Sequence, residues 1–153
     1  MALTTFVLFQ IETQVFALPA NAVRQVIRSV APSMPLKAPP LLTGIINMGG
    51  RPIALVNIRK QFGLPERGIR PSDRILLTES SGYPAAFAVD AILDVCELEA
   101  LPFSDPERIY PGMARFMAGM ATYGRHTVLI HDIATLIPSE TIQELNRAVE
   151  TAE

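Results

Sequence analysis

The stretch Gly44-Ile45-Ile46-Asn47-Met48-Gly49-Gly50-Arg51-Pro52-Ile53-Ala54-Leu55-Val56 carries the pattern that decides the fold. Two apolar runs of strand length flank the pair Gly49-Gly50. Because glycine reaches positive φ without strain, this arrangement predicts a β-hairpin. The next residues, Ile58–Phe62, are predicted to form a short helical turn that ends at Gly63. The basic unit of the chain is therefore a hairpin followed by a short helix.

The same unit recurs later in the chain. Gly44 and Gly49 reappear as Gly119 and Gly124, at an offset of 75 residues (119 − 44). Two longer matches agree with this order: Phe16-Ala17-Leu18 with Phe87-Ala88-Val89, and Val56-Asn57-Ile58 with His131-Asp132-Ile133. The chain is therefore predicted to be a degenerate duplication. Each half would contain a hairpin, a third strand, a long irregular connection, a second hairpin and a short helix.

Short apolar runs outside the glycine hairpins predict the remaining strands. They are Thr5–Ile11, Val15–Leu18, Ala22–Ile27 and Arg74–Leu77. The segment Pro65–Ser72, rich in Gly, Pro and charge, is predicted to link the halves. We therefore expect an all-β protein of two five-stranded lobes, about residues 15–70 and 71–138, within one domain of residues 1–138. Half of this chain is marginal for a core of its own, so the lobes should share a hydrophobic junction.

Residues 139–153 are predicted to form a helical tail. Ile142, Leu145 and Val149 stand at helical spacing, and Thr141 with Glu144 matches a capping box. Two interpretations remain open for this helix. It either docks on the protein's own barrel, which we favour, or binds a partner.

Composition narrows the class of protein. The chain is 49% hydrophobic and 18% charged, with one cysteine and a net charge of −2. It has no basic leader and no apolar run near the ~20 residues of a membrane span, so a cytoplasmic location without direct membrane insertion is expected. Basic residues are scattered among acids, which argues against nucleic acid as a partner. The high apolar content indicates either a large core or apolar surface exposed for protein contacts.

The residue types that often take part in catalysis or metal binding do not form a recognisable catalytic or metal site in this sequence. His126 and His131 are five apart on a predicted strand and so face opposite sides, which argues against a shared metal site. Cys96 has acidic neighbours and is interpreted as a buried structural cysteine. Asp90 and Asp94 are interpreted as residues that end a strand and solvate a bend. We therefore expect no enzyme activity, no cofactor and no metal.

The order of the motifs resembles the CheW-like domain, which occurs in chemotaxis coupling proteins and at the end of CheA histidine kinases. The resemblance covers residues 5 to about 138 and rests on Phe6–Phe9, Phe16–Pro19, Val23–Arg28, Gly44–Gly50, Leu55–Arg59, Arg74–Leu77, Ala88–Asp90, Ile92–Val95 and Leu129–Ile133. It implies two SH3-like five-stranded barrels about a shared core, and it leaves open an exchange of the N-terminal strand between the lobes.

The resemblance also implies a function. Members of this family are scaffolds that join the cytoplasmic tip of a chemoreceptor to the regulatory domain of a CheA-type kinase, in ring-like arrays at the membrane. The receptor hairpin would lie in an apolar groove at the lobe junction, and the kinase would contact the barrel flanks. The protein-binding residues expected here are Val23, Arg24, Gln25, Val26, Ile27, Arg28, Met48, Gly49, Arg51 and Asn57. For the aliphatic members of this set, an ordinary core position is the alternative.

The sequence departs from the family pattern at three of these positions. Gly49 replaces an arginine tied to partner binding, Asn57 replaces an acid, and Gln25 stands where glutamate is frequent. Arg51, two residues on, is a partial substitute for the missing arginine. These departures favour an alternative, a divergent paralogue that serves another motility or surface-sensing pathway. A third hypothesis, an enzyme or small-molecule sensor that uses His131 and Asp132, is the least favoured.

Overall fold

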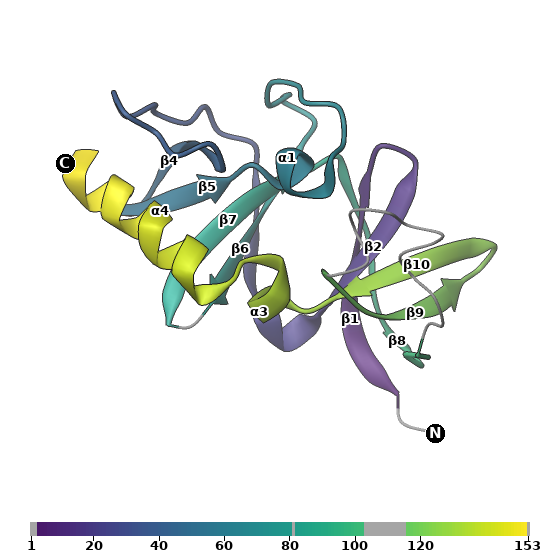
Figure 1. Ribbon diagram of the computed structural model, residues 1–153. Coiled ribbons are helices and arrows are strands. Elements are labelled where there is room, and N and C mark those ends of the chain that lie inside the picture. The colour runs from purple at the N-terminus through teal and green to yellow at the C-terminus, as the bar shows by residue number, and fades with distance from the viewer. Residues whose placement is uncertain (1–2, 81, 103–115, 153) are drawn as a thin grey trace.

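The computed structural model describes residues 3–80, 82–102 and 116–152 and consists mainly of β-strands (Figure 1). The strands are β1 (Thr4–Ile11), β2 (Gln14–Pro19), β3 (Val23–Arg28), β4 (Leu42–Met48), β5 (Arg51–Val56), β6 (Arg74–Ser80), β7 (Tyr83–Val89), β8 (Ala91–Leu98), β9 (Met117–Tyr123) and β10 (His126–His131). The helices are the 3-10 turn η1 (Ala20–Ala22), α1 (Ile58–Phe62), α3 (Ile133–Leu136) and α4 (Ser139–Ala152). Of the described helices, none has the length and apolar content to cross a membrane.

The glycine hairpin is confirmed. Met48 pairs with Arg51, so Gly49 and Gly50 form a two-residue turn between β4 and β5. Both glycines have positive φ, 63° and 89°, as a type I′ turn requires. The Asn47 side chain supports the turn, because its Oδ1 accepts a hydrogen bond from the Gly50 N–H at 2.6 Å. The predicted helix at residues 58–62 is also confirmed, and Gly63 ends it with φ 72°.

The strands form two five-stranded sheets that lie side by side in Figure 1. Sheet A has the order β8-β1-β2-β10-β9, and sheet B has the order β3-β6-β7-β5-β4. Neighbours are antiparallel except for the central pairs, β2 with β10 and β5 with β7, which are parallel. The all-β class is confirmed, and two curled five-stranded sheets are consistent with SH3-like lobes.

The strand order corrects the expected lobe boundaries at residues 15–70 and 71–138. Sheet A combines β1 and β2 from the first half with β8, β9 and β10 from the second. Sheet B combines β6 and β7 from the second half with β3, β4 and β5 from the first. The two halves have thus exchanged their first hairpins. The reason is that β2 and β7 pair in parallel with the last strand of the other half, a choice that the strand pattern alone does not specify.

The two halves also repeat a close approach between a glycine and a preceding segment of the chain. A Cβ on Gly44 would lie 2.9 Å from the carbonyl oxygen of Ser33, and one on Gly119 would lie 3.0 Å from that of Leu101. Each glycine therefore lets an incoming segment approach the first strand of the second hairpin. The segments form matching isolated bridges, Ser33 with Ile45 and Leu101 with Met120. The repeated glycines in the sequence mark these two close approaches.

The central strands bury both of their faces. One set of side chains enters a core shared by the two sheets: Val7, Phe9, Phe16, Leu18, Ala54, Val56, Leu76, Phe87, Val89 and Leu129. The alternate set packs in a smaller cluster within each sheet, around Leu8 and Val128 in sheet A and around Leu55 and Ile75 in sheet B. The shared hydrophobic junction is confirmed. A large core therefore accounts for much of the apolar content.

The tail helix α4 docks on the protein itself. Ile142, Leu145 and Val149 are buried in the shared core together with Leu136 and Ile137. The helix lies along sheet B, where it contacts β5 and β7 (Figure 1). The favoured interpretation of the tail is thus confirmed for its apolar face.

Candidate protein-interaction site

The first group of predicted binding residues lies on β3, an edge strand of sheet B. In the described strand order, β3 pairs with β6 and has no strand on its other side. Arg24, Gln25 and Arg28 are exposed. The Arg24 guanidinium forms a 2.7 Å ion pair with Glu79 of the neighbouring strand. Among the residues that the structure describes, this edge therefore presents a charged surface that no further strand covers.

The three aliphatic residues of β3 have different surroundings. Val23 packs against the shared core, and Ile27 packs against the small cluster within sheet B. Val26 remains 40% exposed. The core alternative therefore fits Val23 and Ile27, while Val26 is the apolar residue that β3 presents to solvent between Arg24 and Arg28.

A second group of predicted residues lies at the turn between β4 and β5. Gly49 and Arg51 are exposed and Met48 is half-buried. No heavy atom lies within 4 Å of a Cβ built on Gly49, so the turn faces open space. Because β4 and β3 are opposite ends of the strand order of sheet B, the predicted set is divided between two edges.

Asn57 has a role inside the molecule. Its Oδ1 accepts a hydrogen bond from the Lys60 N–H at 3.1 Å, which caps helix α1, and its Nδ2 donates to Glu66 Oε1 at 2.8 Å. An aspartate at this position would keep the cap but would place a second carboxylate against Glu66. The replacement of the usual acid by Asn57 is therefore explained by its local partner.

A network of ion pairs that the sequence analysis missed joins the two sheets. Arg59 of α1 pairs with Glu12, which lies between β1 and β2, and at 2.6 Å with Asp90, which lies between β7 and β8. The same guanidinium donates to the Pro65 carbonyl at 3.0 Å. Asp90 also accepts from the Glu12 N–H at 2.9 Å. Asp90 therefore ends β7 at a bend, as interpreted from the sequence, and in addition bridges sheet A and helix α1.

Arg67 extends this network into the predicted linker. It pairs with Asp90 at 2.8 Å and with both carboxylate oxygens of Asp73 at 2.8 Å. Burial favours the neutral form of Asp73, but hydrogen bonds from Arg67 and from the Arg70 N–H outweigh it and lower the pKa of Asp73. The hydrogen bond to Asp73 correspondingly raises the pKa of Arg67 against burial. One sequence feature could have indicated this ion-pair network: a charged residue directly beside a buried strand, as in Val89-Asp90-Ala91.

His131 is buried in the shared core and does not combine with Asp132. Its Nδ1–H donates to the Phe116 carbonyl at 2.8 Å, and its ring packs against Phe16 and Phe62. Burial lowers the pKa of His131 to about 4, so the ring is neutral at pH 7. The exposed Asp132 instead caps α3 through a hydrogen bond from the Ala134 N–H. The pair required by the enzyme or sensor hypothesis is therefore not assembled.

The remaining histidine lies on β10, and the cysteine and Asp94 lie on β8. His126 is exposed at the start of β10, so the two histidines are separated as the spacing predicted. Cys96 is half-buried against the small cluster of sheet A, where burial raises its pKa. Asp94 lies within β8 and accepts a 2.8 Å hydrogen bond from the Tyr123 hydroxyl, a position that corrects its assignment to a bend. Among the described residues, no three potential metal-ligating side chains come together.

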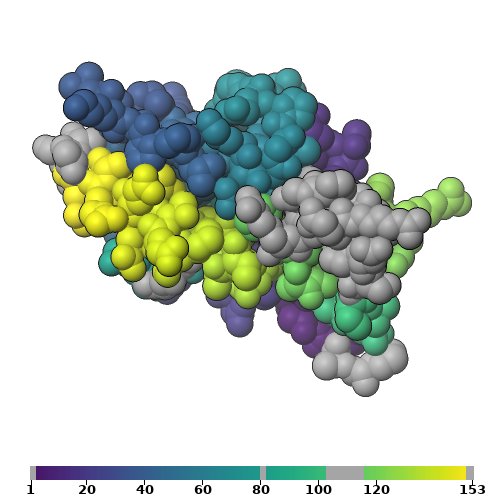
Figure 2. Space-filling view, viewed as in Figure 1, coloured from purple at the N-terminus to yellow at the C-terminus, as the bar shows by residue number. Residues whose placement is uncertain are grey.

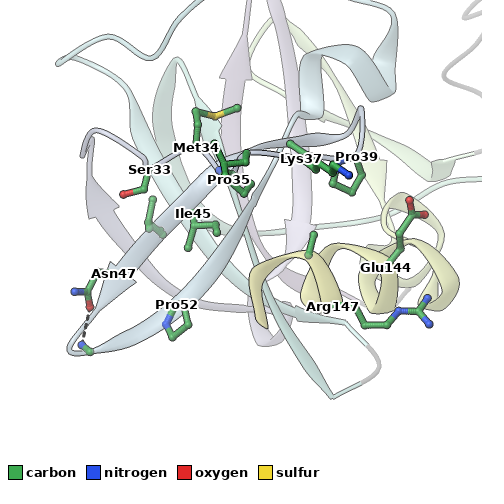
Figure 3. Close-up of a pocket in the computed structure, with 15 residues that line it drawn as sticks. Ser33, Met34, Pro35, Lys37, Pro39, Ile45, Asn47, Pro52, Glu144 and Arg147 are labelled. Carbon is green, nitrogen blue, oxygen red and sulfur yellow. Dashed lines mark hydrogen bonds between the residues drawn. The ribbon is translucent and has the colours of Figure 1, made fainter. Parts of the chain in front are cut away.

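A groove of about 1070 Å³ borders the β4–β5 turn. Ile45 and Pro52 lie between two walls, the segment of residues 33–39 and helix α4 (Figure 3). The walls contribute Met34, Lys37 and Pro39 on one side and Glu144, Arg147 and Ala148 on the other. None of the β3 residues lines this groove. It is therefore a surface that the sequence analysis did not anticipate.

Comparisons with known proteins agree with this fold. A family model described as the CheW-like domain matches residues 5–141. The chain is 24% identical over 145 residues to a chemotaxis protein CheW of Treponema pallidum (strain Nichols), covering 91% of this chain and 85% of that protein. It is also similar to a crystal structure of the scaffolding protein TtCheW from Thermoanaerobacter tengcongensis, with a TM-score of 0.76, 24% identity, and coverage of 92% of this chain and 96% of that one. Because the family model spans nearly the whole chain and the strand arrangement matches, this protein belongs to the CheW-like domain family.

Proposed function

We propose that this protein is a non-catalytic scaffold that couples the cytoplasmic tip of a chemoreceptor to the regulatory domain of a CheA-type histidine kinase. The observation that carries the proposal is edge strand β3, where Val26 is exposed between Arg24 and Arg28. An exposed apolar side chain flanked by charges, on an edge strand, is suited to a protein partner. The chemotaxis and scaffolding roles named for its relatives support the same conclusion.

The proposal divides the predicted residues between two partners. The receptor tip contacts β3 beside the lobe junction, and the kinase regulatory domain contacts the flank at the β4–β5 turn, around Met48, Gly49 and Arg51. The protein works in the cytoplasm and is recruited to receptor arrays, including ring-like ones. Since β3 and the β4–β5 turn are both parts of sheet B, the two contacts would be held in a fixed relation.

Calorimetry with the receptor tip and the kinase regulatory domain of the same organism tests this function. Val26→Glu is expected to weaken receptor-tip binding by more than about tenfold, because a charge would replace the apolar contact. Val95→Glu is the matched control: Val95 is 57% exposed on β8, the strand of sheet A that corresponds to β3. Circular dichroism must show both variants folded. The proposed function is wrong if the unmodified protein binds neither partner. The assignment of the receptor contact to β3 is wrong if Val26→Glu and Val95→Glu weaken receptor-tip binding equally.

A divergent paralogue with other partners remains the second candidate. Two departures from the family pattern face solvent, Gln25 on β3 and Gly49 at the turn. Gly49→Arg tests this candidate because open space surrounds the position, although its φ of 63° costs a side chain about 1 kcal/mol. A gain in binding to the kinase regulatory domain would show that the loss of arginine changed the partner. Unaltered binding would remove the motive for this candidate. Asn57→Asp is unsuitable as a test, because it disturbs Glu66.

A further inference from the structure

The groove between residues 33–39 and helix α4 is a second surface with the properties of a docking site. Its floor is apolar, with Ile45 and Pro52, and α4 contributes Ala148 to one wall. In the space-filling view, the yellow surface of α4 runs beside the blue surface of the first-half segments (Figure 2). The groove is large enough to receive several side chains of a partner.

The opposite wall exposes large apolar side chains. Leu36 is fully exposed and Met34 is 63% exposed. Both belong to a segment with prolines at positions 32, 35, 39 and 40, which restrict its backbone. Exposed apolar side chains on a stiff segment beside an apolar floor are typical of a protein-binding surface.

The backbone of β4 restricts how a partner can enter. Ile45 N–H donates to the Ser33 carbonyl at 2.7 Å, and Ser33 N–H donates to the Ile45 carbonyl at 2.8 Å. The edge of β4 is therefore already occupied beside the groove, so an added strand cannot pair at Ile45. A partner that fills the groove beside Ile45 does so with side chains. An amphipathic helix does this with apolar residues at i, i+3, i+4 and i+7.

The charge around the groove selects the polar face of that helix. Residues 23–89, which form sheet B and its connections, contain nine Lys and Arg but three Asp and Glu, and α4 contains one Arg and three Glu, so that sheet B and α4 together carry a net charge of +4 (+6 − 2). Lys37 lines the groove and is exposed, with no ion pair to any residue that the structure describes. Among the lining residues, Glu144 is the one acid beside the two bases Lys37 and Arg147. This excess of positive charge favours an acidic partner.

From these observations, we propose that the groove between residues 33–39, β4 and α4 docks an acidic amphipathic helix of a protein partner. Such a site would be separate from β3, because the two surfaces share no residues. It also depends on α4, most of which lies beyond the segment that matches the family model. The helix α4 thus has two roles: Ile142, Leu145 and Val149 face the core, while Glu144, Arg147 and Ala148 face the groove.

The full-length protein and two synthetic peptides test this proposal. Both are short stapled helices with leucine at i, i+3, i+4 and i+7, and the remaining positions are glutamate in one and lysine in the other. Fluorescence anisotropy measures their affinities, and amide shifts in NMR spectra locate the bound peptide. The glutamate peptide is expected to shift the amides of Ile45 and Ala148 and to bind about tenfold more tightly than the lysine peptide at low salt.

Two exposed positions provide variants that should leave the fold intact. Leu36→Ser and Lys37→Glu are each expected to lower the affinity for the glutamate peptide by about five- to tenfold. Lys60→Glu is the matched control, because it makes the same charge change at an exposed position of α1 outside the groove. It is expected to leave the affinity nearly unchanged.

Four outcomes would overturn the proposal. They are no binding of the glutamate peptide at millimolar concentration, equal binding of the lysine peptide, amide shifts confined to β3, and equal effects of Lys37→Glu and Lys60→Glu. The groove could instead be occupied by a second copy of this protein, which sedimentation of the protein alone tests. Concentration-dependent dimers that are lost in Leu36→Ser would make the groove an interface between copies and overturn the proposal. None of these measurements involves the receptor or the kinase, so their result is independent of the function proposed above.

Discussion

Arg59 has a buried side chain and several charged or polar partners that its place in the sequence does not indicate. It lies on a five-residue helix, yet its side chain is only 9% exposed and contacts Glu12, Asp90 and the Pro65 carbonyl. These partners come from the turn of sheet A, from the strand connection after sheet B and from the linker. A buried guanidinium requires such partners, because removing its charge from water is costly. The network therefore ties three connections together over the junction.

Removal of this charge is expected to destabilise the protein strongly. Arg59→Met keeps the apolar stem but leaves Glu12 without its partner and Asp90 with one fewer, so the free energy of unfolding should fall by about 3 kcal/mol. Urea unfolding followed by circular dichroism measures it.

Arg24→Met serves as the matched control for Arg59→Met. The Arg24 side chain is 66% exposed in its pair with Glu79, so its loss should cost less than about 1 kcal/mol. Similar costs for the two variants would contradict the structural role of the network.

His131 is expected to make stability depend on pH in a defined window. Its folded pKa, about 4, lies below the ordinary value of 6.5, so the unfolded chain binds the proton more tightly. Its contribution is therefore complete above pH 6.5 and is lost as the pH falls toward 4, by up to about 3 kcal/mol. Unfolding by urea at a series of pH values should show this loss.

Two glutamine variants isolate the contribution of His131. His131→Gln should flatten the profile between pH 6.5 and 4, because glutamine does not titrate. His126→Gln should retain the profile of the unmodified protein, since His126 is exposed. A profile that stays steep in His131→Gln would assign the pH dependence to other groups.

At the scale of elements, α4 is part of the core and not an appendage. Three of its side chains are buried with residues of both sheets, and its contacts run along β5 and β7. The sequence spacing predicted its apolar face, but the groove on its flank depends on residues 33–39, which precede α4 by about a hundred positions.

Loss of one core side chain from α4 should be costly. Leu145→Ala is expected to lower the free energy of unfolding by about 2–4 kcal/mol, because it leaves a cavity in the shared core. Gln143→Ala, at an exposed position of the same helix, should change it by less than about 0.5 kcal/mol. Equal values in thermal or urea unfolding would mean that α4 is not packed as described.

At the scale of the whole molecule, the exchanged hairpins make the two halves interdependent. Each sheet takes two strands from one half and three from the other. The shared core likewise combines Phe16 from the first half with Phe87 from the second. Neither half contains a complete sheet.

Fragments cut between the halves should therefore fold only together. Residues 1–68 and 69–153, expressed separately, are expected to show little β structure by circular dichroism, because each lacks the hairpin that completes its sheet. Mixing them should restore the β signal in a one-to-one complex, measured by size exclusion. A fragment 1–68 that unfolds cooperatively by itself would contradict the exchanged arrangement.

The sequence by itself determined the glycine turns, the short helices, the duplication, the apolar face of α4 and most of the strands, although it assigned Asp94 of β8 to a bend. These features follow from local rules: strand and helix periodicity, and the positive φ that Gly49 and Gly124 supply at their turns. The family resemblance also predicted Val26 as a protein-binding residue together with Gly49 and Asn57; the structure leaves Val26 exposed on β3, at the end of sheet B opposite to β4.

Only the tertiary structure decided which strands pair and which polar residues meet. The parallel pairing of β2 with β10 and of β5 with β7 joins segments far apart in the chain, and nothing in a local pattern selects between partners of similar hydrophobicity. The same pairing brings Glu12, Arg59 and Asp90 together, and the packing of α4 beside residues 33–39 creates the groove. Local sequence fixes periodicity and turn conformation, whereas contacts between distant segments depend on how the whole core packs.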